Sequence, residues 1–111
     1  MQQEILTAID KILEDRKQQT AEQSYVASLY DKGLEKILKK ISEESTEVVM
    51  AAKDKENNNS LENKEHLIYE VADLWFHTMV LLAHQDLTTQ DITKELERRF
   101  GLSGLVEKAN R

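Results

Sequence analysis

The sequence contains no cysteine and no proline, and it has only three glycines among 111 residues. Without cysteine, a disulfide framework, a thiolate zinc site and a cysteine nucleophile are excluded. The strongest helix breakers are nearly missing, which predicts an all-α fold. No apolar run approaches the roughly 18 residues of a membrane span, and Met1 to Asp10 lacks the basic and apolar blocks of a signal peptide. We therefore expect a cytoplasmic protein with no membrane partner.

The charge balance is acidic, with 21 acidic against 15 basic residues and a formal net charge of −6. No dense basic run is present, so a nucleic-acid partner held through phosphate neutralisation is not expected. A polyanionic substrate would instead need a bridging cation. The hydrophobic share of 40% is typical of a folded chain, and the length predicts one helical domain over residues 1–111 with a single site.

Apolar residues recur at helical spacing through most of the chain. The longest stripes predict two antiparallel helices, Leu34 to Ala52 and Glu65 to His84, joined by a solvated, asparagine-rich loop over Asp54 to Asn63. Trp75 lies at the centre of the second stripe and is predicted to be buried. Shorter helices are predicted around Ile5 to Leu13, from Ser24 to Gly33 and from Thr88 to Gly101, followed by a docked or frayed tail, Leu102 to Arg111.

Two pairs of acidic residues border these stripes: Glu44 and Glu47 on the first helix, and Glu70 and Asp73 on the second. At ~100° per residue, residues three apart lie about 60° apart and one turn along, so each pair shares a side of its helix. Packing the two apolar stripes together would bring the four carboxylates to one groove. A simpler alternative, that they belong to solvated helix faces, stays open on spacing alone.

Clustered carboxylates repel one another unless a cation lies among them. Mg²⁺ prefers hard oxygen ligands and commonly bridges carboxylates to substrate phosphates, so these four acids predict a Mg²⁺ site. Such an ion can act as a Lewis acid on phosphoryl oxygens and activate a water for attack on phosphorus. Glu43, turned away from its neighbours, is predicted to support proton transfer beside Glu44 and Glu47. The pattern does not decide which carboxylate is the base.

Five further residues are candidates for substrate binding, each with a structural alternative. Lysines could neutralise phosphate oxygens, or form ordinary helix ion pairs such as one between Lys40 and Glu44. Tyr25 could stack on a purine or bind a ribose, or it could pack in the core. His77 lies on the same line of its helix as Asp73, where an imidazole could approach phosphate. The candidates are Tyr25, Lys32, Lys40, Lys53 and His77.

Longer stretches of the sequence carry more information than these spacings. They are Ser24-Tyr25 with Leu29 and Lys32-Gly33, KISEESTEVVMAAK (Lys40 to Lys53), LIYEVADLWFH (Leu67 to His77), LTTQDITKELERR (Leu87 to Arg99) and SGLVEKANR (Ser103 to Arg111). On these stretches the chain resembles the phosphoribosyl-ATP pyrophosphatase family over nearly its whole length. The E-x-x-E and E-x-x-D pair alone is shared with the wider all-α nucleotide pyrophosphohydrolases, including MazG-like enzymes. Ser42, often glycine in relatives, and the asparagine-rich loop depart from the pattern.

The resemblance implies hydrolysis of 1-(5-phosphoribosyl)-ATP between its α and β phosphates, giving 1-(5-phosphoribosyl)-AMP and pyrophosphate, the second step of histidine biosynthesis. It also implies a four-helix-type bundle assembled as a homodimer, with Mg²⁺ held by Glu44, Glu47, Glu70 and Asp73, and Glu43 nearby. Self-association is expected independently, because an isolated helix pair would leave much apolar surface exposed. A cyclohydrolase domain fused to some relatives uses cysteines to bind zinc, so the lack of cysteine predicts a stand-alone enzyme.

Two alternatives remain open. A house-cleaning (d)NTP pyrophosphohydrolase would keep the four acids but accept a smaller nucleotide, and dNTP turnover well above that of phosphoribosyl-ATP would favour it. A non-catalytic helical dimerisation module would have merely solvated acidic faces. In that case Glu47→Gln or Asp73→Asn would change neither Mg²⁺ affinity nor hydrolysis.

Overall fold

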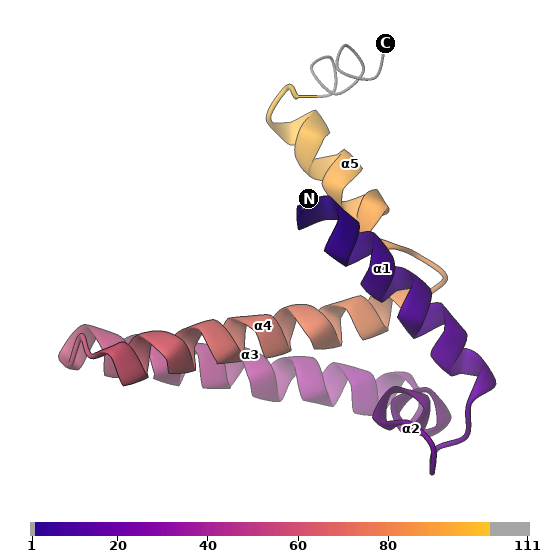
Figure 1. The fold of residues 1–111 in the computed structure, drawn as a ribbon, viewed down its shortest axis with the longest axis horizontal. Helices are drawn as coiled ribbons and strands as arrows, with labels where there is room; N and C mark the ends of the chain where they lie inside the picture. Colours follow the sequence, from indigo (N-terminus) through magenta and orange to yellow (C-terminus); the bar gives the residue numbers. More distant parts are fainter. Residues whose placement is uncertain (1, 103–111) are drawn as a thin grey trace.

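A computed structural model describes residues 2–102, and every regular element within that range is a helix (Figure 1). The all-α prediction is therefore confirmed. Among the described helices, none is both long and apolar enough to cross a membrane. The predicted tail lies outside the described residues from Ser103 onward. The elements in chain order are α1 (Gln2–Asp15), the 3-10 turn η1 (Arg16–Gln18), α2 (Tyr25–Lys32), α3 (Leu34–Asn57), α4 (Leu61–His84) and α5 (Thr89–Arg99).

The antiparallel pair α3 and α4 forms the longest part of the molecule, and its connection is much shorter than expected (Figure 1). The predicted loop over Asp54 to Asn63 is wrong, since only three residues separate the two helices. The polar residues of this segment act as helix caps. The Ser60 hydroxyl accepts from the backbone N–H of Asn63, and the Asn63 amide donates to the carbonyls of Asp54 and Asn58. These bonds satisfy backbone groups at both helix ends.

The short helix α2 begins and ends as predicted. The Ser24 hydroxyl accepts from the backbone N–H of Ala27 at 3.2 Å, which caps the helix start. Gly33 ends the helix with φ +91°, a conformation that side-chain-bearing residues rarely adopt, and α3 starts at the next residue. This tight turn places α2 against the start of α3.

The core lies where α1, α2, α3 and α4 meet at one end of the hairpin. Leu13, Leu29, Ile37 and Val80 are almost completely buried there. Trp75, predicted to be buried, is instead 60% exposed in the single chain. The periodic pattern identified an apolar face correctly, but it could not tell whether this chain or another molecule covers that face.

Helices α1 and α5 form a second arm that projects from the hairpin (Figure 1). Asp10 on α1 joins them, because its carboxylate accepts from the backbone N–H of Thr89 at 3.1 Å and from the Thr89 hydroxyl. Thr89 is the first residue of α5, where free N–H groups and the helix dipole favour a negative charge. The predicted start of this helix is confirmed, since the N–H of Thr88 donates to the Asp91 carboxylate at 2.9 Å.

Replacing Asp10 with alanine should lower the free energy of unfolding by about 1–3 kcal/mol, because two buried or half-buried donors of Thr89 lose their acceptor. Urea denaturation at one fixed protein concentration measures the change. Asp15→Ala is the matched control, since Asp15 is exposed in the last turn of α1 and should change stability little. Equal effects of the two substitutions would contradict the proposed contribution of Asp10.

Candidate active site

An acidic cluster lies between the two long helices. Glu44 comes from the middle of α3, and Asp73 and His77 come from successive turns of α4. One ligand atom from each of these three residues lies within 4.8 Å of the others. Glu44 and His77 are buried, and Asp73 is half-buried. The antiparallel packing of α3 on α4 therefore brings together residues that are about thirty positions apart in the sequence.

Burial and negative neighbours make the ionised form of Glu44 costly. The pKa of Glu44 is raised to about 7, mainly by burial and further by a hydrogen bond to the Asp73 side chain and by the charges of Asp73 and Glu70. The ammonium group of Lys40, 3.6 Å from Glu44, acts in the opposite direction. Two buried carboxylates that repel each other in this way are stabilised when a cation lies between them.

Three of the four predicted metal ligands occupy this region. Glu70 is 8% exposed, and its carboxylate lies 3.3 Å from the His66 imidazole, one turn earlier on α4. Glu47 differs from the other three because it is exposed on α3. Neither Glu47 nor Glu70 belongs to the group of close ligand atoms formed by Glu44, Asp73 and His77. The spacing thus predicted that Glu44 and Glu47 share a side of α3. How deeply each of them is buried depends on which residues of α4 lie opposite.

Lys40 connects the cluster to Glu43. Its ammonium group donates to the Glu43 carboxylate at 3.3 Å, in addition to its contact with Glu44. Glu43 is exposed, so its carboxylate reaches water while it stays beside the buried acids. The ion pair expected between Lys40 and Glu44 is present. Lys32 and Lys53, the other predicted phosphate contacts, are exposed on α2 and α3.

Tyr25 and His77 contact each other directly, although 52 residues separate them in the sequence. The Tyr25 hydroxyl lies 2.9 Å from Nε2 of His77, and the two rings meet edge to face. Burial raises the pKa of the Tyr25 hydroxyl, which keeps it protonated at neutral pH. Both residues were candidates for substrate binding, but nothing in the sequence pattern predicted this contact. It depends on how α2 packs beside the hairpin.

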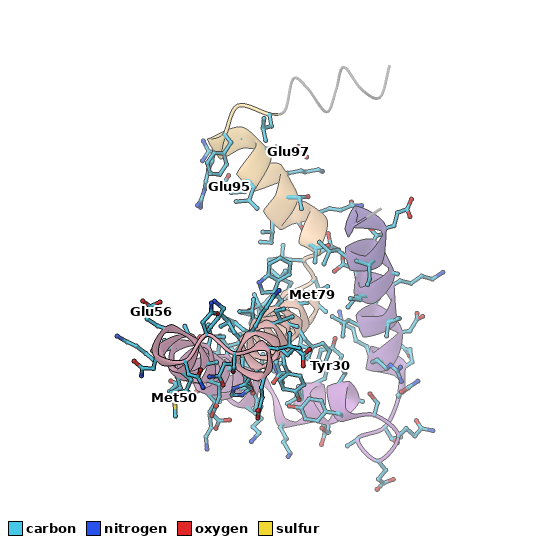
Figure 2. The ribbon with its side chains drawn as sticks, turned by 60° about the vertical axis from the view of Figure 1, so that its left-hand side comes forward. Tyr30, Met50, Glu56, Met79, Glu95 and Glu97 are labelled. Atoms are coloured by element: carbon cyan, nitrogen blue, oxygen red, sulfur yellow. The ribbon has the colours of Figure 1, made fainter. Side chains whose placement is uncertain are left out.

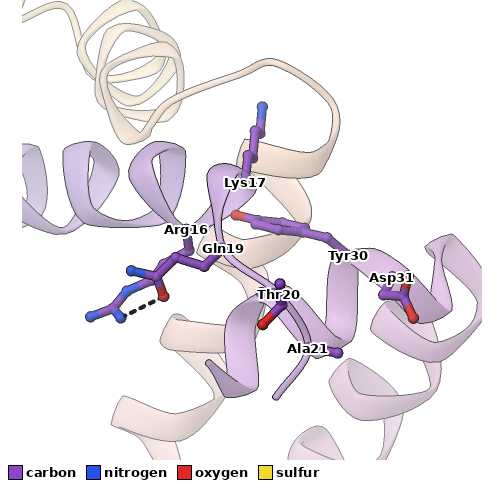
Figure 3. A pocket seen from close by; sticks show the side chains of 8 residues that line it. Arg16, Lys17, Gln19, Thr20, Ala21, Tyr30 and Asp31 are labelled. Carbon is purple, nitrogen blue, oxygen red and sulfur yellow. Dashed lines mark hydrogen bonds between the residues drawn. The ribbon is translucent and has the colours of Figure 1, made fainter. Parts of the chain in front are cut away.

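A separate pocket of about 420 Å³ lies on another part of the chain (Figure 3). It is formed by η1, the connection after it and α2, and it contains none of the acidic-cluster residues. Arg16 donates to the Gln19 side chain at its edge, and Lys17 is paired with Glu14 and Asp86. Lys17 is thus ion-paired, whereas Arg16 donates to a neutral amide, and neither residue belongs to the acidic cluster.

The donor set of the cluster fits a hard divalent cation. It offers carboxylate oxygens from Glu44 and Asp73, with the carboxylate of Glu70 nearby. His77 is a weaker ligand candidate, because both of its ring nitrogens already have hydrogen-bond partners. Mg²⁺ prefers oxygen ligands over nitrogen, which agrees with a site made of carboxylates.

Comparison with known proteins identifies the family. Residues 6–100 match the family described as phosphoribosyl-ATP pyrophosphohydrolase. The chain belongs to the phosphoribosyl-ATP pyrophosphohydrolase family. The resemblance inferred from the sequence motifs is therefore confirmed, and the matched range contains every residue of the acidic cluster.

Individual members of this family are similar to the chain over nearly their whole length. A phosphoribosyl-ATP pyrophosphatase of Hydrogenovibrio crunogenus is 62% identical, with 100% of this chain and 96% of the relative covered. The enzyme of the same name from Neisseria meningitidis serogroup B is 56% identical, with 96% of this chain and 94% of the relative covered. One from Methylococcus capsulatus is 54% identical, with 97% of this chain and 96% of the relative covered.

Proposed function

We propose that this chain, as one domain, hydrolyses 1-(5-phosphoribosyl)-ATP at the α-β phosphoanhydride to 1-(5-phosphoribosyl)-AMP and pyrophosphate, the second step of histidine biosynthesis. The observation that carries the proposal is the close similarity to relatives named phosphoribosyl-ATP pyrophosphatase, which runs through the acidic cluster. The proposed place of action is the cytoplasm, as we expect for a biosynthetic enzyme similar to these relatives.

The proposed cofactor is Mg²⁺, held by Glu44, Glu47, Glu70 and Asp73. Its support is the crowding of buried carboxylates, which raises the pKa of Glu44, together with the preference of Mg²⁺ for oxygen ligands. Glu47 lies on α3 one turn beyond Glu44, where an exposed side chain is free to turn. When bound, the ion would supply Lewis acidity to the phosphoryl oxygens and make a water more acidic.

The chain's own residues would bind and orient the substrate and accept the proton of the attacking water. Lys40 stands beside the carboxylates and can bind a phosphate oxygen as a point charge. Glu43 keeps its carboxylate in contact with water, which suits a proton acceptor. Glu44 and Glu47 are the other proposed catalytic acids. Contacts of Tyr25, Lys32, Lys53 and His77 with the substrate stay predictions.

The proposed assembly is a homodimer, and the shape of the single chain supports it. Its radius of gyration is 16.5 Å, whereas a compact domain of this length is expected near 13 Å. Its accessible surface is 8322 Å², against about 6,300 Å² expected for a monomer of this mass. Figure 2 shows how side chains surround the hairpin, with Met50 directed outward. Such an open shape fits a chain that packs against another copy.

An exposed apolar stripe on α4 is the proposed contact surface. Leu61, Ile68 and Trp75 are each about 60–70% exposed and follow one another at seven-residue intervals, the spacing of a helix-packing seam. Two copies of the hairpin joined along this stripe would give the expected four-helix-type bundle. The second copy is the proposed occupant because one self-complementary apolar surface serves both chains of a twofold dimer.

Trp75→Arg should convert the dimer to a monomer, since a charge in a buried apolar seam lacks a partner. Light scattering at micromolar concentration should give about twice 12.8 kDa for the wild type and about 12.8 kDa for the variant. Asn59→Arg, which adds the same charge to the exposed turn between α3 and α4, is the control and should stay dimeric. A monomeric wild type would overturn the proposed assembly.

A substrate panel tests the proposed function. Pyrophosphate release should be fastest from phosphoribosyl-ATP with Mg²⁺, with far slower release from dATP and dUTP. Faster release from the dNTPs would show that ordinary nucleotides, not phosphoribosyl-ATP, are the substrate, and it would leave the proposed site unchanged. No release from any of the three would remove the proposed activity altogether.

A further inference from the structure

The hydrogen bonds of His77 fix its protonation pattern. Its Nδ1 lies 2.9 Å from the backbone carbonyl of Asp73, and a carbonyl oxygen can only accept. The proton of the neutral imidazole must therefore be on Nδ1. Nε2 is left with a lone pair, so at 2.9 Å the Tyr25 hydroxyl donates to it.

Little in the surroundings offers His77 a different arrangement. His77 is 3% exposed, so water does not compete freely for either ring nitrogen. Phe76 and Tyr25 both meet the ring edge to face, at centroid distances of 5.0 Å and 5.9 Å. The Tyr25 hydroxyl is thus the polar contact that joins α2 to His77.

The same Nδ1–H also faces the Asp73 carboxylate, with Oδ1 3.5 Å away. Asp73 in turn contacts Glu44 on the neighbouring helix. A chain of contacts therefore runs from Tyr25 through His77 to the acids that are the candidate metal ligands. Groups that orient a metal-binding carboxylate commonly change metal affinity or activity by about 10–100-fold when removed.

We propose that Tyr25 is a positioning residue, whose hydroxyl holds His77 as the Nδ1–H tautomer so that the imidazole keeps the Asp73 carboxylate directed toward Glu44. In this arrangement His77 is not a metal ligand, because its lone pair on Nε2 is taken by Tyr25. The inference rests on the proposed carboxylate metal site, and it assigns Tyr25 a role that requires no contact with substrate.

Tyr25→Phe removes the hydroxyl and keeps the ring. Tyr69→Phe is the matched control, because Tyr69 is 66% exposed on α4. The first measurement is the ¹⁵N spectrum of the imidazoles in the full-length, metal-free protein. The second is Mn²⁺ affinity by electron paramagnetic resonance without substrate, with Mn²⁺ standing in for Mg²⁺. The third is kcat and KM for phosphoribosyl-ATP.

We expect His77 of the wild type to show the Nδ1–H tautomer, opposite to the form that dominates in free histidine. Tyr25→Phe should shift the Nε2 resonance and weaken Mn²⁺ binding about 10-fold, with a similar fall in kcat and little change in KM. Tyr69→Phe should change none of these.

An Nε2–H tautomer in the wild type would overturn the inference, and that result does not depend on any variant folding. Unchanged Mn²⁺ affinity in Tyr25→Phe would also overturn it, and a rise in KM alone would assign Tyr25 to substrate contact instead. Absence of hydrolysis by the wild type would remove the proposed function. The ¹⁵N spectrum and the Mn²⁺ affinity do not depend on hydrolysis, so they would still decide the role of Tyr25.

Discussion

Asp73→Asn is expected to lower the rate of pyrophosphate release by on the order of 100- to 1000-fold. The substitution preserves the size of the side chain but removes one negative oxygen ligand from the buried cluster. A steady-state assay with phosphoribosyl-ATP at saturating Mg²⁺ measures the change. Most of the loss should appear in kcat, because the cluster acts on the reacting phosphates rather than on the distant parts of the substrate.

The control for this substitution is Glu56→Gln, which removes a carboxylate from the exposed far end of the hairpin (Figure 2). It should leave the rate unchanged. Metal-free Asp73→Asn should also be at least as stable as the wild type, since the change relieves repulsion with Glu44. Full activity of Asp73→Asn would show that the cluster is an ordinary group of acidic helix residues with no catalytic role. Equal loss in both variants would show that the effect does not depend on the cluster.

Metal-free protein should lose stability as the pH rises from about 4.5 to about 7. The pKa of Glu44 is about 7 in the folded chain and 4.5 in the unfolded chain, so the folded state holds an extra proton in this window. Raising the pH then favours the unfolded state, and the loss persists above pH 7. We expect a decrease of about 1–3 kcal/mol, because residual solvent contact of Glu44 screens the neighbouring charges and reduces the full effect of the shift.

Urea denaturation in EDTA at pH 5, 6, 7 and 8, at one protein concentration, measures this dependence. The Glu44→Gln variant cannot ionise at this position, so the free energy of unfolding should fall less steeply with pH. The variant should therefore be more stable than the wild type at pH 8. Saturating Mg²⁺ should stabilise the wild type most above pH 7, where Glu44 is ionised and able to bind the ion. Parallel pH profiles of the wild type and Glu44→Gln would contradict the assignment of the raised pKa.

The helices and most of the acidic site could be predicted because they depend on local rules. The 3.6-residue period determines which side of a helix Glu44, Glu70 and Asp73 share with the apolar stripe. The cap at Ser24 and the left-handed Gly33 likewise have clear local signals. The loop prediction failed because asparagine and serine favour helix caps as well as loops, and only the contacts of Asn63 distinguish these outcomes.

Other features depend on contacts between distant segments and left no local signal. The bond between Tyr25 and His77 joins α2 to α4, and the bond between Asp10 and Thr89 joins α1 to α5. Each involves common residue types whose partners the spacing does not reveal. Trp75 shows the opposite case, since its apolar pattern was clear but the side chain is 60% exposed in the single chain.

Binding of Mn²⁺ to the metal-stripped protein tests the central claim, a carboxylate metal site between α3 and α4, most directly. Electron paramagnetic resonance of Mn²⁺ should show binding to the wild type that Mg²⁺ displaces. That binding should be lost in Asp73→Asn and in Glu44→Gln, and kept in Glu56→Gln. Equal Mn²⁺ binding by all four proteins, or none by the wild type, would contradict the claim.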